Sequence, residues 1–367
     1  MKIKVDLKKE IDDSYNISIG KNLFSQILSF LKERKEIGKI AIITDDNVKK
    51  LHGIQLKENL EKEGILCYLI SFNHGEKNKN RKTKQKLEDS LLDLGFGRDS
   101  LLISLGGGVV GDMTGFVAST LNRGIPYIQI PTTLLSMIDS SVGGKTGVDT
   151  KQGKNLIGTF HQPEAVFIDI NYLNTLPQKE FINGMAEQIK HSIISDLDLF
   201  SFIEQNLDSI LKKEEKTLLK CITKSCKIKS KIVNLDEKES DGIRQILNFG
   251  HTIGHVIEKE SKFKIPHGFA ISIGMSVEAK IANELGLIDK LSIEKIDSLL
   301  KRTRLFIKVP KEISTNNIMK SLSLDKKSKK GIPKFILISG IGKVKNKPNY
   351  SHFVDEKIII KSINDSK

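Results

Sequence analysis

Three histidines are grouped in the second half of the chain, in a pattern that suits metal binding. The stretch LNFGHTIGHVIE contains His251 and His255, and His267 follows in PHG. A helix over residues 246–259 would place His251 and His255 on one face, because helical residues four apart are neighbours. Imidazole is a common zinc ligand, although Thr252 stands where the H-E-x-x-H motif needs glutamate. The pattern predicts either a metal site or a pair of hydrogen-bonded core histidines.

A glycine-rich stretch in the first half suits nucleotide binding. In SLLISLGGGVVGDMTGF, Gly106, Gly108 and Gly111 form G-x-G-x-x-G after an apolar run and before a helix-like run. Such glycines allow a tight turn and let backbone N–H groups approach a pyrophosphate. The acid expected about 20 residues later is absent, and the nearest candidates, Asp45 and Glu76, come earlier in the chain. The stretch predicts a dinucleotide site with a non-standard acid, or a tight turn without a ligand.

A lysine-rich segment follows, PTTLLSMIDSSVGGKTGVDTKQGKNLIGTFHQP, which is too irregular for a long helix. GGKTG is not a Walker A loop, because that motif needs glycine where Asp139 stands. Lys145 and Lys154 would bind phosphate or carboxylate as point charges. A solvated surface loop is the alternative interpretation of the same residues.

Two kinds of organisation divide the chain. Apolar runs at 39–44, 65–71, 100–105 and 125–131 alternate with amphipathic segments at 47–64 and 79–95. This alternation predicts an α/β domain with a parallel sheet, whose ligands lie beyond the carboxyl ends of the strands. From 178 to about 325 long amphipathic stretches predict an all-α domain, and 334–342 predicts a late strand. We expect an α/β domain over 1–176 and a mainly helical domain over 177–367.

Composition narrows the classes of function. The 59 basic and 45 acidic residues give a net charge of +14, which raises the possibility of nucleic-acid binding. Only seven of the basic residues are arginine, tryptophan is absent, and lysines alternate with acids. A solvated surface is therefore favoured over a nucleic-acid interface. Three cysteines without CxxC spacing, and no apolar signal or membrane segment, predict a cytoplasmic protein without a membrane partner.

Many short phrases, in one order, resemble the 3-dehydroquinate synthase family. They run from about residue 45 to 327 and include TDDNV, HGEKNK, GGGVVGDMTGF, GKNLIGTFHQP, GMAEQIKH, LNFGHTIGHVIE and PHGFAISIGM. The resemblance implies an NAD-binding α/β domain followed by a helical metal-binding domain. It also implies that Glu187, His251 and His267 bind Zn²⁺ or Co²⁺, whereas His255 contacts the substrate and relays a proton.

The resemblance further implies two sets of ligand-binding residues. For NAD they are Asp45, Asn47, His74, Gly75, Glu76, Lys77, Asn78, Lys79, Gly108, Val109, Val110, Gly111, Asp112, Thr132, Thr133, Lys145, Lys154, Tyr172, Leu173, Asn174 and Thr175. For the substrate they are Arg123, Asp139, Lys145, Asn155, Lys190, Lys229, Arg244, Asn248, His255 and Lys327, with Lys326 as the alternative to the last. Lys154 is also expected to hold the substrate phosphate, together with Lys190, Asn155 and Arg123.

The implied reaction converts 3-deoxy-D-arabino-heptulosonate 7-phosphate, a phosphorylated sugar acid, to 3-dehydroquinate and phosphate. NAD is regenerated in each turnover, and the reaction belongs to the shikimate pathway of aromatic amino acid biosynthesis. Related cyclases that make inosose or valiolone products, and metal-dependent polyol dehydrogenases, are the alternatives. Arg244, Asn248 and the LDKK lysine favour the first reading, because they suit a substrate carboxylate. The family also implies a homodimer.

Overall fold

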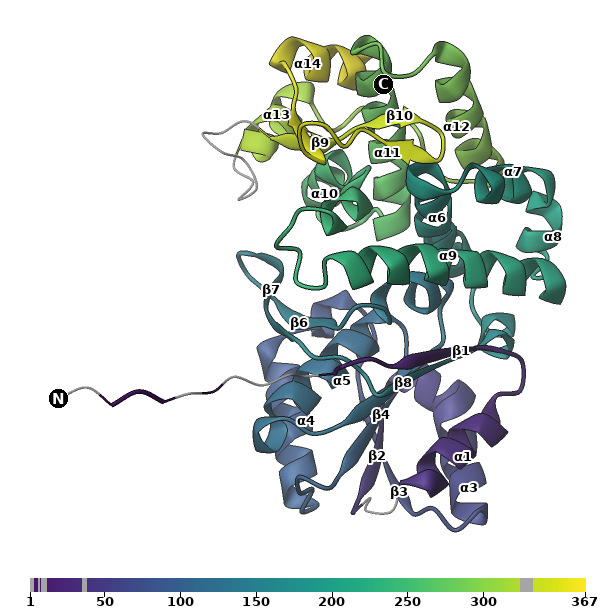
Figure 1. Ribbon diagram of the computed structural model, residues 1–367, viewed down its shortest axis with the longest axis vertical. Coiled ribbons are helices and arrows are strands. Elements are labelled where there is room, and N and C mark those ends of the chain that lie inside the picture. The colour runs from purple at the N-terminus through teal and green to yellow at the C-terminus, as the bar shows by residue number, and fades with distance from the viewer. Residues whose placement is uncertain (1–2, 6, 8–11, 35–37, 324–332) are drawn as a thin grey trace.

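A six-stranded sheet organises the first half of the computed structural model, which describes residues 3–5, 7, 12–34, 38–323 and 333–367. The strand order is β1-β8-β5-β4-β2-β3, and all neighbours are parallel. The strands are β1 (Asn16–Gly20), β2 (Ile40–Asp45), β3 (Cys67–Phe72), β4 (Leu101–Gly106), β5 (Tyr127–Pro131) and β8 (Ala165–Asp169). Parallel neighbours bring all their carboxyl ends to one edge, which lies toward the helical half (Figure 1).

Helices cover both faces of this sheet, which explains why its strands are almost continuously apolar. Ile40 and Ile42 of β2 pack in one core cluster, with side chains of α1 (Phe24–Glu33) and α3 (Ile54–Lys62). Ala41 and Ile43 of the same strand pack in another, with side chains of α4 (Arg81–Asp93) and α5 (Gly108–Thr120). Alternate residues of one strand therefore enter opposite cores.

The predicted strand–helix alternation is confirmed. The four apolar runs form β2, β3, β4 and β5, and the late run forms β9 (Lys334–Ile336) and β10 (Ile338–Gly340). The amphipathic segment 47–64 is divided into α2 (Asp46–Val48), the π-helix η1 (Lys49–Gly53) and α3. The edge strand β1 and its neighbour β8 complete the sheet without having been anticipated.

The lysine-rich segment is more regular than predicted. Instead of an open loop, residues beyond the π-helix η4 (Ser136–Ser140) form an antiparallel hairpin of β6 (Lys145–Thr150) and β7 (Gly153–Phe160). Gly147 and Gly158 face each other across it, and a Cβ on Gly158 would lie 1.9 Å from the Thr146 carbonyl oxygen. Glycines thus permit a close backbone approach, a three-dimensional contact that local irregularity does not reveal.

Helices dominate the second half of the chain, as predicted. The long ones are α6 (Gln178–Ser195), α9 (Glu215–Leu235), α10 (His251–Glu260), α11 (His267–Glu284) and α12 (Lys290–Arg302). The short elements are α7 (Leu197–Gln205), α8 (Leu207–Leu211), α13 (Thr315–Ser323), α14 (Glu356–Asn364), β11 (Lys343–Val344) and β12 (Ser351–Phe353). Figure 1 shows α9 lying across the junction between the two halves. None of the described helices combines the length and apolarity needed to span a membrane.

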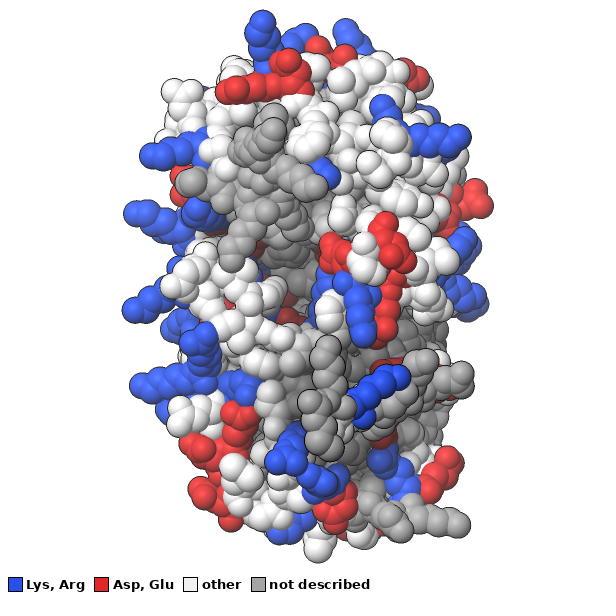
Figure 2. Space-filling model, turned by 60° about the vertical axis from the view of Figure 1, so that its left-hand side comes forward, with Lys and Arg blue, Asp and Glu red and all other residues white. Residues whose placement is uncertain are grey.

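The surface carries its positive charge in a dispersed form. On the face in Figure 2, lysine and arginine side chains are spread along the molecule, with acidic side chains among them. The same view shows a hollow near the middle of the molecule, in which acidic atoms are visible. The functional side chains described below lie at the junction of the two halves.

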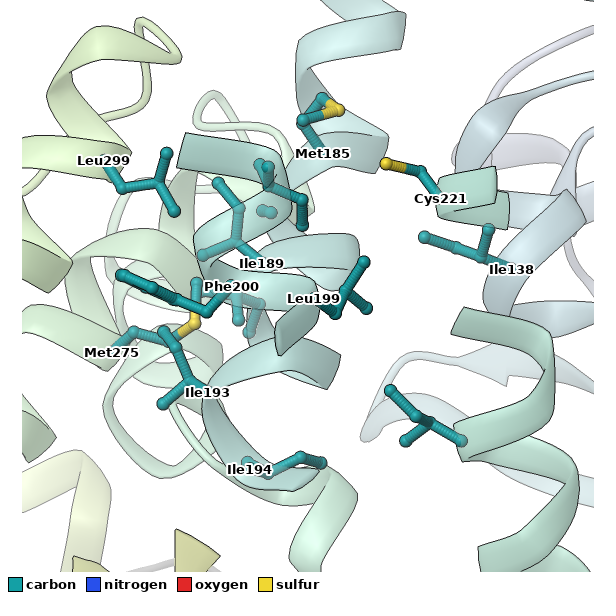
Figure 3. Packing of buried hydrophobic residues seen from close by; sticks show 14 of the residues in the cluster. Ile138, Met185, Ile189, Ile193, Ile194, Leu199, Phe200, Cys221, Met275 and Leu299 are labelled. Atoms are coloured by element: carbon teal, nitrogen blue, oxygen red, sulfur yellow. The ribbon is translucent and has the colours of Figure 1, made fainter. Parts of the chain in front are cut away.

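The central helix of the second half is buried nearly all round. Met185, Ile189 and Ile193 of α6 pack with Phe200 of α7 and Met275 of α11 (Figure 3). This cluster continues into the sheet half of the molecule, so one core joins the two halves. Burial of each such side chain contributes about 1.5–3 kcal/mol. Helix α6 therefore has a rigid frame from which to present polar side chains.

The predicted helix over 246–259 is wrong at its start. Residues Arg244–Asn248 form the 3-10 helix η6, and α10 begins only at His251. Gly250 interrupts the two with a φ of 79°, a left-handed conformation that favours glycine. A Cβ there would lie 2.6 Å from Met275 Cγ, and one on Gly274 would lie 1.9 Å from the Gly250 carbonyl oxygen. The close crossing of α10 over α11 thus places His251 at a helix N-terminus.

Candidate metal centre and cofactor cleft

Three side chains from three helices meet in the helical half. Glu187 of α6 is fully buried, and His251 and His267 are the first residues of α10 and α11. The Nε2 atoms of His251 and His267 lie 3.5 and 3.4 Å from Oε1 of Glu187. All three donor atoms lie within 4.8 Å of one another. One carboxylate oxygen and two imidazole nitrogens form a donor set suited to a catalytic divalent metal.

Both imidazoles are held from behind. Nδ1 of His251 lies 3.1 Å from the carbonyl oxygen of Phe249, and Nδ1 of His267 lies 3.2 Å from Oε2 of Glu258. Each oxygen accepts a hydrogen bond from Nδ1–H, which leaves the Nε2 lone pair directed at Glu187. Metal-binding histidines in proteins are usually oriented in this way.

The charges at this cluster also suit a cation. Burial opposes ionisation of Glu187, but Lys190, His251 and His267 hold the pKa of its carboxyl well below the usual range. Burial and the Lys190 charge lower the pKa of His251, which keeps that ring neutral. Burial disfavours a charged His267, yet its contacts with the Glu187 and Glu258 carboxylates raise its pKa to about 10. A metal ion would therefore displace a proton from His267.

The residues present fit a metal by a further criterion. Neither oxygen of the buried Glu187 carboxylate accepts a well-aligned hydrogen bond from a described residue. The Lys190 ammonium forms an ion pair with Oε2, so Oε1 faces only the two imidazoles. A buried carboxylate oxygen without a hydrogen bond is costly, and a cation between the three donors would remove that cost.

A second buried polar cluster adjoins the metal centre. The Lys229 ammonium of α9 donates to the main-chain oxygen and Oδ1 of Asp139, each at 2.5 Å. Burial opposes ionisation of Asp139, but Lys229 lowers the pKa of its carboxyl to about 2. His191, next to Lys190 on α6, lies 4.0 Å from Asp139, and burial lowers its pKa to about 3. Predicted substrate residues from η4, α6 and α9 are thus brought together.

The glycine turn lies at the carboxyl end of β4. A Cβ on Gly106 would lie 2.5 Å from Val110, and one on Gly108 would lie 3.1 Å from Ser140 Oγ. The amide of Thr132, just after β5, donates to the Gly106 carbonyl oxygen at 2.9 Å. The turn therefore leads directly into α5, whose first-turn amides face the cleft edge in the manner of a phosphate-binding site.

The other predicted NAD residues follow the carboxyl ends of strands in the same sheet. Asp45 ends β2, and its Oδ1 accepts the amides of Asn47 and Val48 at 2.9 Å. After β3, His74 contacts Asp46 through its amide and its ring. The remaining positions lie on this edge as Gly75 to Lys79 after β3, Val109 to Asp112 in α5, Thr133 after β5, and Tyr172 to Thr175 after β8.

Lys79 connects three parts of this edge. Its side chain is 4% exposed, and its ammonium donates to Asp112 Oδ2 and Asn155 Oδ1 at 2.5 Å. The Lys79 carbonyl accepts the amide of Asp149 at 2.8 Å, and Asp149 Oδ1 accepts the amide of Asn155. This network fixes the β6–β7 hairpin against the glycine turn. Asn155, predicted for the substrate, is consequently held beside residues predicted for NAD.

Two lysines of the hairpin cross to the helical half. Lys145 forms an ion pair with Glu239, in the segment between α9 and η6. Lys154 lies 2.9 Å from Oε1 of Glu258 and 3.7 Å from Oε1 of Glu76. The predicted anion-binding lysines are therefore already at the junction and paired with carboxylates, which a phosphate group would replace.

A cavity of about 200 Å³ opens beside the metal ligands. Its walls include the predicted residues Asn248, His251 and His255, together with Glu239 and Lys334. The side chain of His255 is half exposed, and its ring centroid lies 5.1 Å from that of His251. His255 is therefore not among the three converging donors, and it faces the space where a ligand would lie.

Arg244 borders the same region from η6. It is buried and donates through Nη2 to the Gly143 carbonyl oxygen at 3.0 Å, and through Nη1 to that of Glu237. Asn248, one turn later, lies 3.4 Å from Oε1 of Glu239. The two residues expected to hold a substrate carboxylate are thus neighbours.

One predicted residue, Arg123, lies away from this cleft, and another lies outside the described residues. Arg123 follows α5 in the 3-10 helix η3 (Leu121–Arg123), where the adjacent Asn122 donates to the Phe96 carbonyl before β4. This position is at the amino ends of the strands. It lies about 20 Å from the glycine turn, the length of α5. Lys327, with its alternative Lys326, lies outside the described residues.

Sequence reasoning missed Glu258 and His191. Glu258 follows His251 by seven and His255 by three residues, so all three lie on one face of α10. That spacing was visible in HTIGHVIE. His191 offers no comparable signal, since its proximity to Asp139 depends on how α6 packs on η4.

Comparisons with known proteins show which family the chain is similar to. Residues 69–183 match the model for the 3-dehydroquinate synthase N-terminal domain, and 184–328 match that for the C-terminal domain. A 3-dehydroquinate synthase of Thermodesulfovibrio yellowstonii is 45% identical over 94% of this chain and 95% of its own. One from Prochlorococcus marinus is 46% identical over 94% and 96%.

Solved structures share the fold. A 2-deoxy-scyllo-inosose synthase complexed with carbaglucose-6-phosphate, NAD⁺ and Co²⁺ has a TM-score of 0.86 at 28% identity, covering 96% of each chain. A 2-epi-5-epi-valiolone synthase of Streptomyces hygroscopicus with NAD⁺ and Zn²⁺ has a TM-score of 0.89 at 24% identity, covering 99% of each chain. The latter likeness concerns the fold alone.

Proposed function

The chain belongs to the 3-dehydroquinate synthase family, and from this membership we propose how its own residues carry out the family's reaction. The reaction converts 3-deoxy-D-arabino-heptulosonate 7-phosphate to 3-dehydroquinate and phosphate. We place the domain boundary between Leu176 and Pro177 and the active site between the two domains. The observation that carries the proposal is the convergence of Glu187 Oε1 with Nε2 of His251 and of His267.

Glu187, His251 and His267 would hold the metal, and zinc is the ion we propose. Zinc accepts this mixture of oxygen and nitrogen donors with an open position, and Co²⁺ would take the same place. When bound, such an ion lowers the pKa of a coordinated substrate hydroxyl and polarises it for oxidation. Glu187 supplies a full negative charge there, because Lys190 and the histidines keep it ionised.

NAD would lie along the carboxyl edge of the sheet. When bound, it accepts a hydride from the substrate and later returns it. Asp45, at the end of β2, is in position to accept a ribose hydroxyl, and the first turn of α5 is in position to bind the pyrophosphate. The Lys79–Asp112–Asn155 network holds the hairpin at this edge, where its polar groups would contact both ligands.

Substrate would fill the junction between the halves. Lys154, Asn155 and Lys190 supply positive or polar groups for its phosphate, while Arg244 and Asn248 supply donors for its carboxylate. Lys229 and Asp139 form a buried ion pair that would hold the hydroxyl groups between these ends. Such fixed donors keep the reacting atoms oriented, which is the main requirement for the later ring opening and closure.

His255 is the residue we assign to proton transfer. Its half-exposed ring lines the cavity beside His251, so Nε2 or Nδ1 can exchange a proton with a substrate hydroxyl and with solvent. Histidine suits this work because its usual pKa is near neutral pH. The substrate's own phosphate would take part in the remaining proton transfer.

One assay tests the proposal. Purified chain is incubated with the heptulosonate phosphate, NAD and Zn²⁺, and the release of phosphate and formation of 3-dehydroquinate are measured. We expect equal amounts of both products and no net consumption of NAD. Removal of the metal with a chelator should stop phosphate release, and Zn²⁺ or Co²⁺ should restore it. Full activity without metal, or stoichiometric consumption of NAD, would contradict the proposal.

A related cyclase activity is the second candidate, since the inosose synthase shares the fold at 28% identity. Parallel assays with glucose 6-phosphate and sedoheptulose 7-phosphate distinguish the candidates, because neither sugar carries the carboxylate that Arg244 and Asn248 would bind. We further propose that the chain works as a cytoplasmic homodimer in the shikimate pathway, without a nucleic-acid or membrane partner.

A further inference from the structure

Glu258 occupies a position that the proposed reaction does not use. It lies on the ligand-bearing face of α10 and its side chain is only 4% exposed. Its two carboxylate oxygens have different partners. Oε2 lies 3.2 Å from Nδ1 of His267, and Oε1 lies 2.9 Å from the ammonium of Lys154.

The first contact, with Nδ1, determines which ring nitrogen of His267 carries the proton. A neutral imidazole carries one proton, and the nitrogen that bears it cannot bind a metal. With Nδ1–H donating to Glu258, the lone pair of Nε2 remains available on the side of Glu187. The ionised Glu258 carboxylate can only accept hydrogen bonds. It therefore strongly favours the tautomer of His267 that carries its proton on Nδ1.

The second contact, with Lys154, keeps the Glu258 carboxylate ionised. Its charge is buried, and Lys154 from β7 supplies the compensating charge from the other half of the molecule. The Lys154 ammonium also lies 5.0 Å from the centre of the Phe263 ring, just beyond α10. The carboxylate is therefore clamped between a metal ligand and the β6–β7 hairpin.

We propose that Glu258 is a positioning residue for the metal centre, which holds His267 in its metal-binding tautomer and links it to the hairpin through Lys154. This inference rests on the proposed metal site. It assigns Glu258 no contact with substrate or cofactor. Its effect is exerted through the orientation of the His267 ring.

The Glu258→Gln variant separates this role from simple space filling. Glutamine keeps the size, but its single oxygen can face either His267 or Lys154. An amide oxygen turned to Lys154 points the NH₂ group at Nδ1, which would then have to be the unprotonated nitrogen and leave the proton on Nε2. Loss of such an orienting partner typically weakens metal binding by about 10- to 100-fold.

The experiment measures Zn²⁺ affinity of the apoprotein by competition with a chromophoric chelator. We expect Glu258→Gln to bind about 10- to 100-fold more weakly than wild type. The matched control is Glu260→Gln on the same helix, whose carboxylate accepts a hydrogen bond from the Ser321 hydroxyl at 2.6 Å. This control should stay within about twofold. Lys154→Met, which leaves the His267 hydrogen bond in place, should lose less than Glu258→Gln.

A second measurement does not depend on the Glu258 variant. Nitrogen-15 NMR of histidine in the Zn²⁺-loaded wild type reports which ring nitrogen of His267 carries the proton, with His267→Gln used to assign the signal. We expect a protonated Nδ1. Metal on Nδ1, or wild-type affinity in Glu258→Gln, would overturn the inference alone. A wild-type chain that binds no Zn²⁺ would overturn the proposed metal centre, and this inference with it.

Discussion

Replacement of Lys190 by methionine should tighten metal binding while it destabilises the metal-free protein. Lys190 is 1% exposed and forms an ion pair with Oε2 of Glu187, the carboxylate that also faces His251 and His267. In the metal-free protein the ammonium is the nearest full positive charge. In the loaded protein it lies beside a divalent cation and repels it. Methionine has a similar length and removes both effects.

The structure gives the size of each effect. Loss of one partner from a buried ion pair costs about 3–5 kcal/mol, and two charges about 4 Å apart at an effective dielectric near 20 interact by about 4 kcal/mol. In a unit of 150–250 residues, about 3 kcal/mol lowers the Tm by roughly 6–12 °C. The metal would compensate Glu187 in the variant. If half of about 3 kcal/mol is recovered on binding, the affinity rises about tenfold.

Thermal unfolding with and without Zn²⁺, together with chelator competition, tests both effects. We expect Lys190→Met to have a lower Tm without metal and a larger rise in Tm on adding metal than wild type. The control is Lys224→Met, which removes an ion pair between Lys224 and Asp196, whose side chains are 30% and 25% exposed. A pair as exposed as this contributes only about 0–1 kcal/mol to stability. Weaker metal binding in Lys190→Met would refute the reasoning, since it would mean that the ammonium supports the site.

Three further outcomes follow from the same residues. The His267→Ala variant should lose its metal. If this variant still held one ion per chain after gel filtration, His267 would not be a metal ligand. Without metal, His267 has a pKa raised to about 10, whereas His251 is neutral. Metal binding should therefore release one proton, and the apparent Zn²⁺ affinity should rise about tenfold per pH unit between about pH 6 and 9. An affinity that does not change with pH would argue against proton release from His267. Burial, opposed by hydrogen bonds from Gly250 and its neighbours, raises the pKa of Glu278 from 4.5 to about 8. Between pH 4.5 and about 8, Glu278 keeps a proton in the folded state that it has lost in the unfolded state. The contribution of Glu278 to the free energy of unfolding therefore falls as pH rises. Glu278→Gln should therefore unfold in urea with a weaker dependence on pH than wild type, and an equal dependence would show that Glu278 is ionised throughout.

The strands that the sequence predicts are those that read as apolar runs, whether they are buried throughout, as β4 is, or partly exposed at the sheet edge, as β3 is. β2 and β4 lie inside the sheet and read as continuous apolar runs, so their composition alone marks them. β1 reads NISIG, with no fully buried residue, and forms the sheet edge only by pairing with β8. Its partner lies about 150 residues later in the chain. Pairing at such separation depends on tertiary packing, which no local pattern records.

The metal centre is even harder to predict from local sequence patterns. Glu187 stands 64 positions before His251, so spacing could not connect them, and the ligand set came from resemblance to a family. Local pattern did place His251 and His255 on one helix face, and their rings are 5.1 Å apart. It could not tell which of them turns toward Glu187.

That choice is made by the backbone before α10. Gly250 has a left-handed conformation and lies too close to α11 for a Cβ. The helix starts at the next residue, His251, whose Nδ1 contacts the Phe249 carbonyl. His255, one turn later, lies inside the helix, where the backbone carbonyls accept the hydrogen bonds of the helix itself. Its half-exposed ring remains beside the cavity. The two histidines of HTIGH thus differ in role because one begins the helix and the other lies within it.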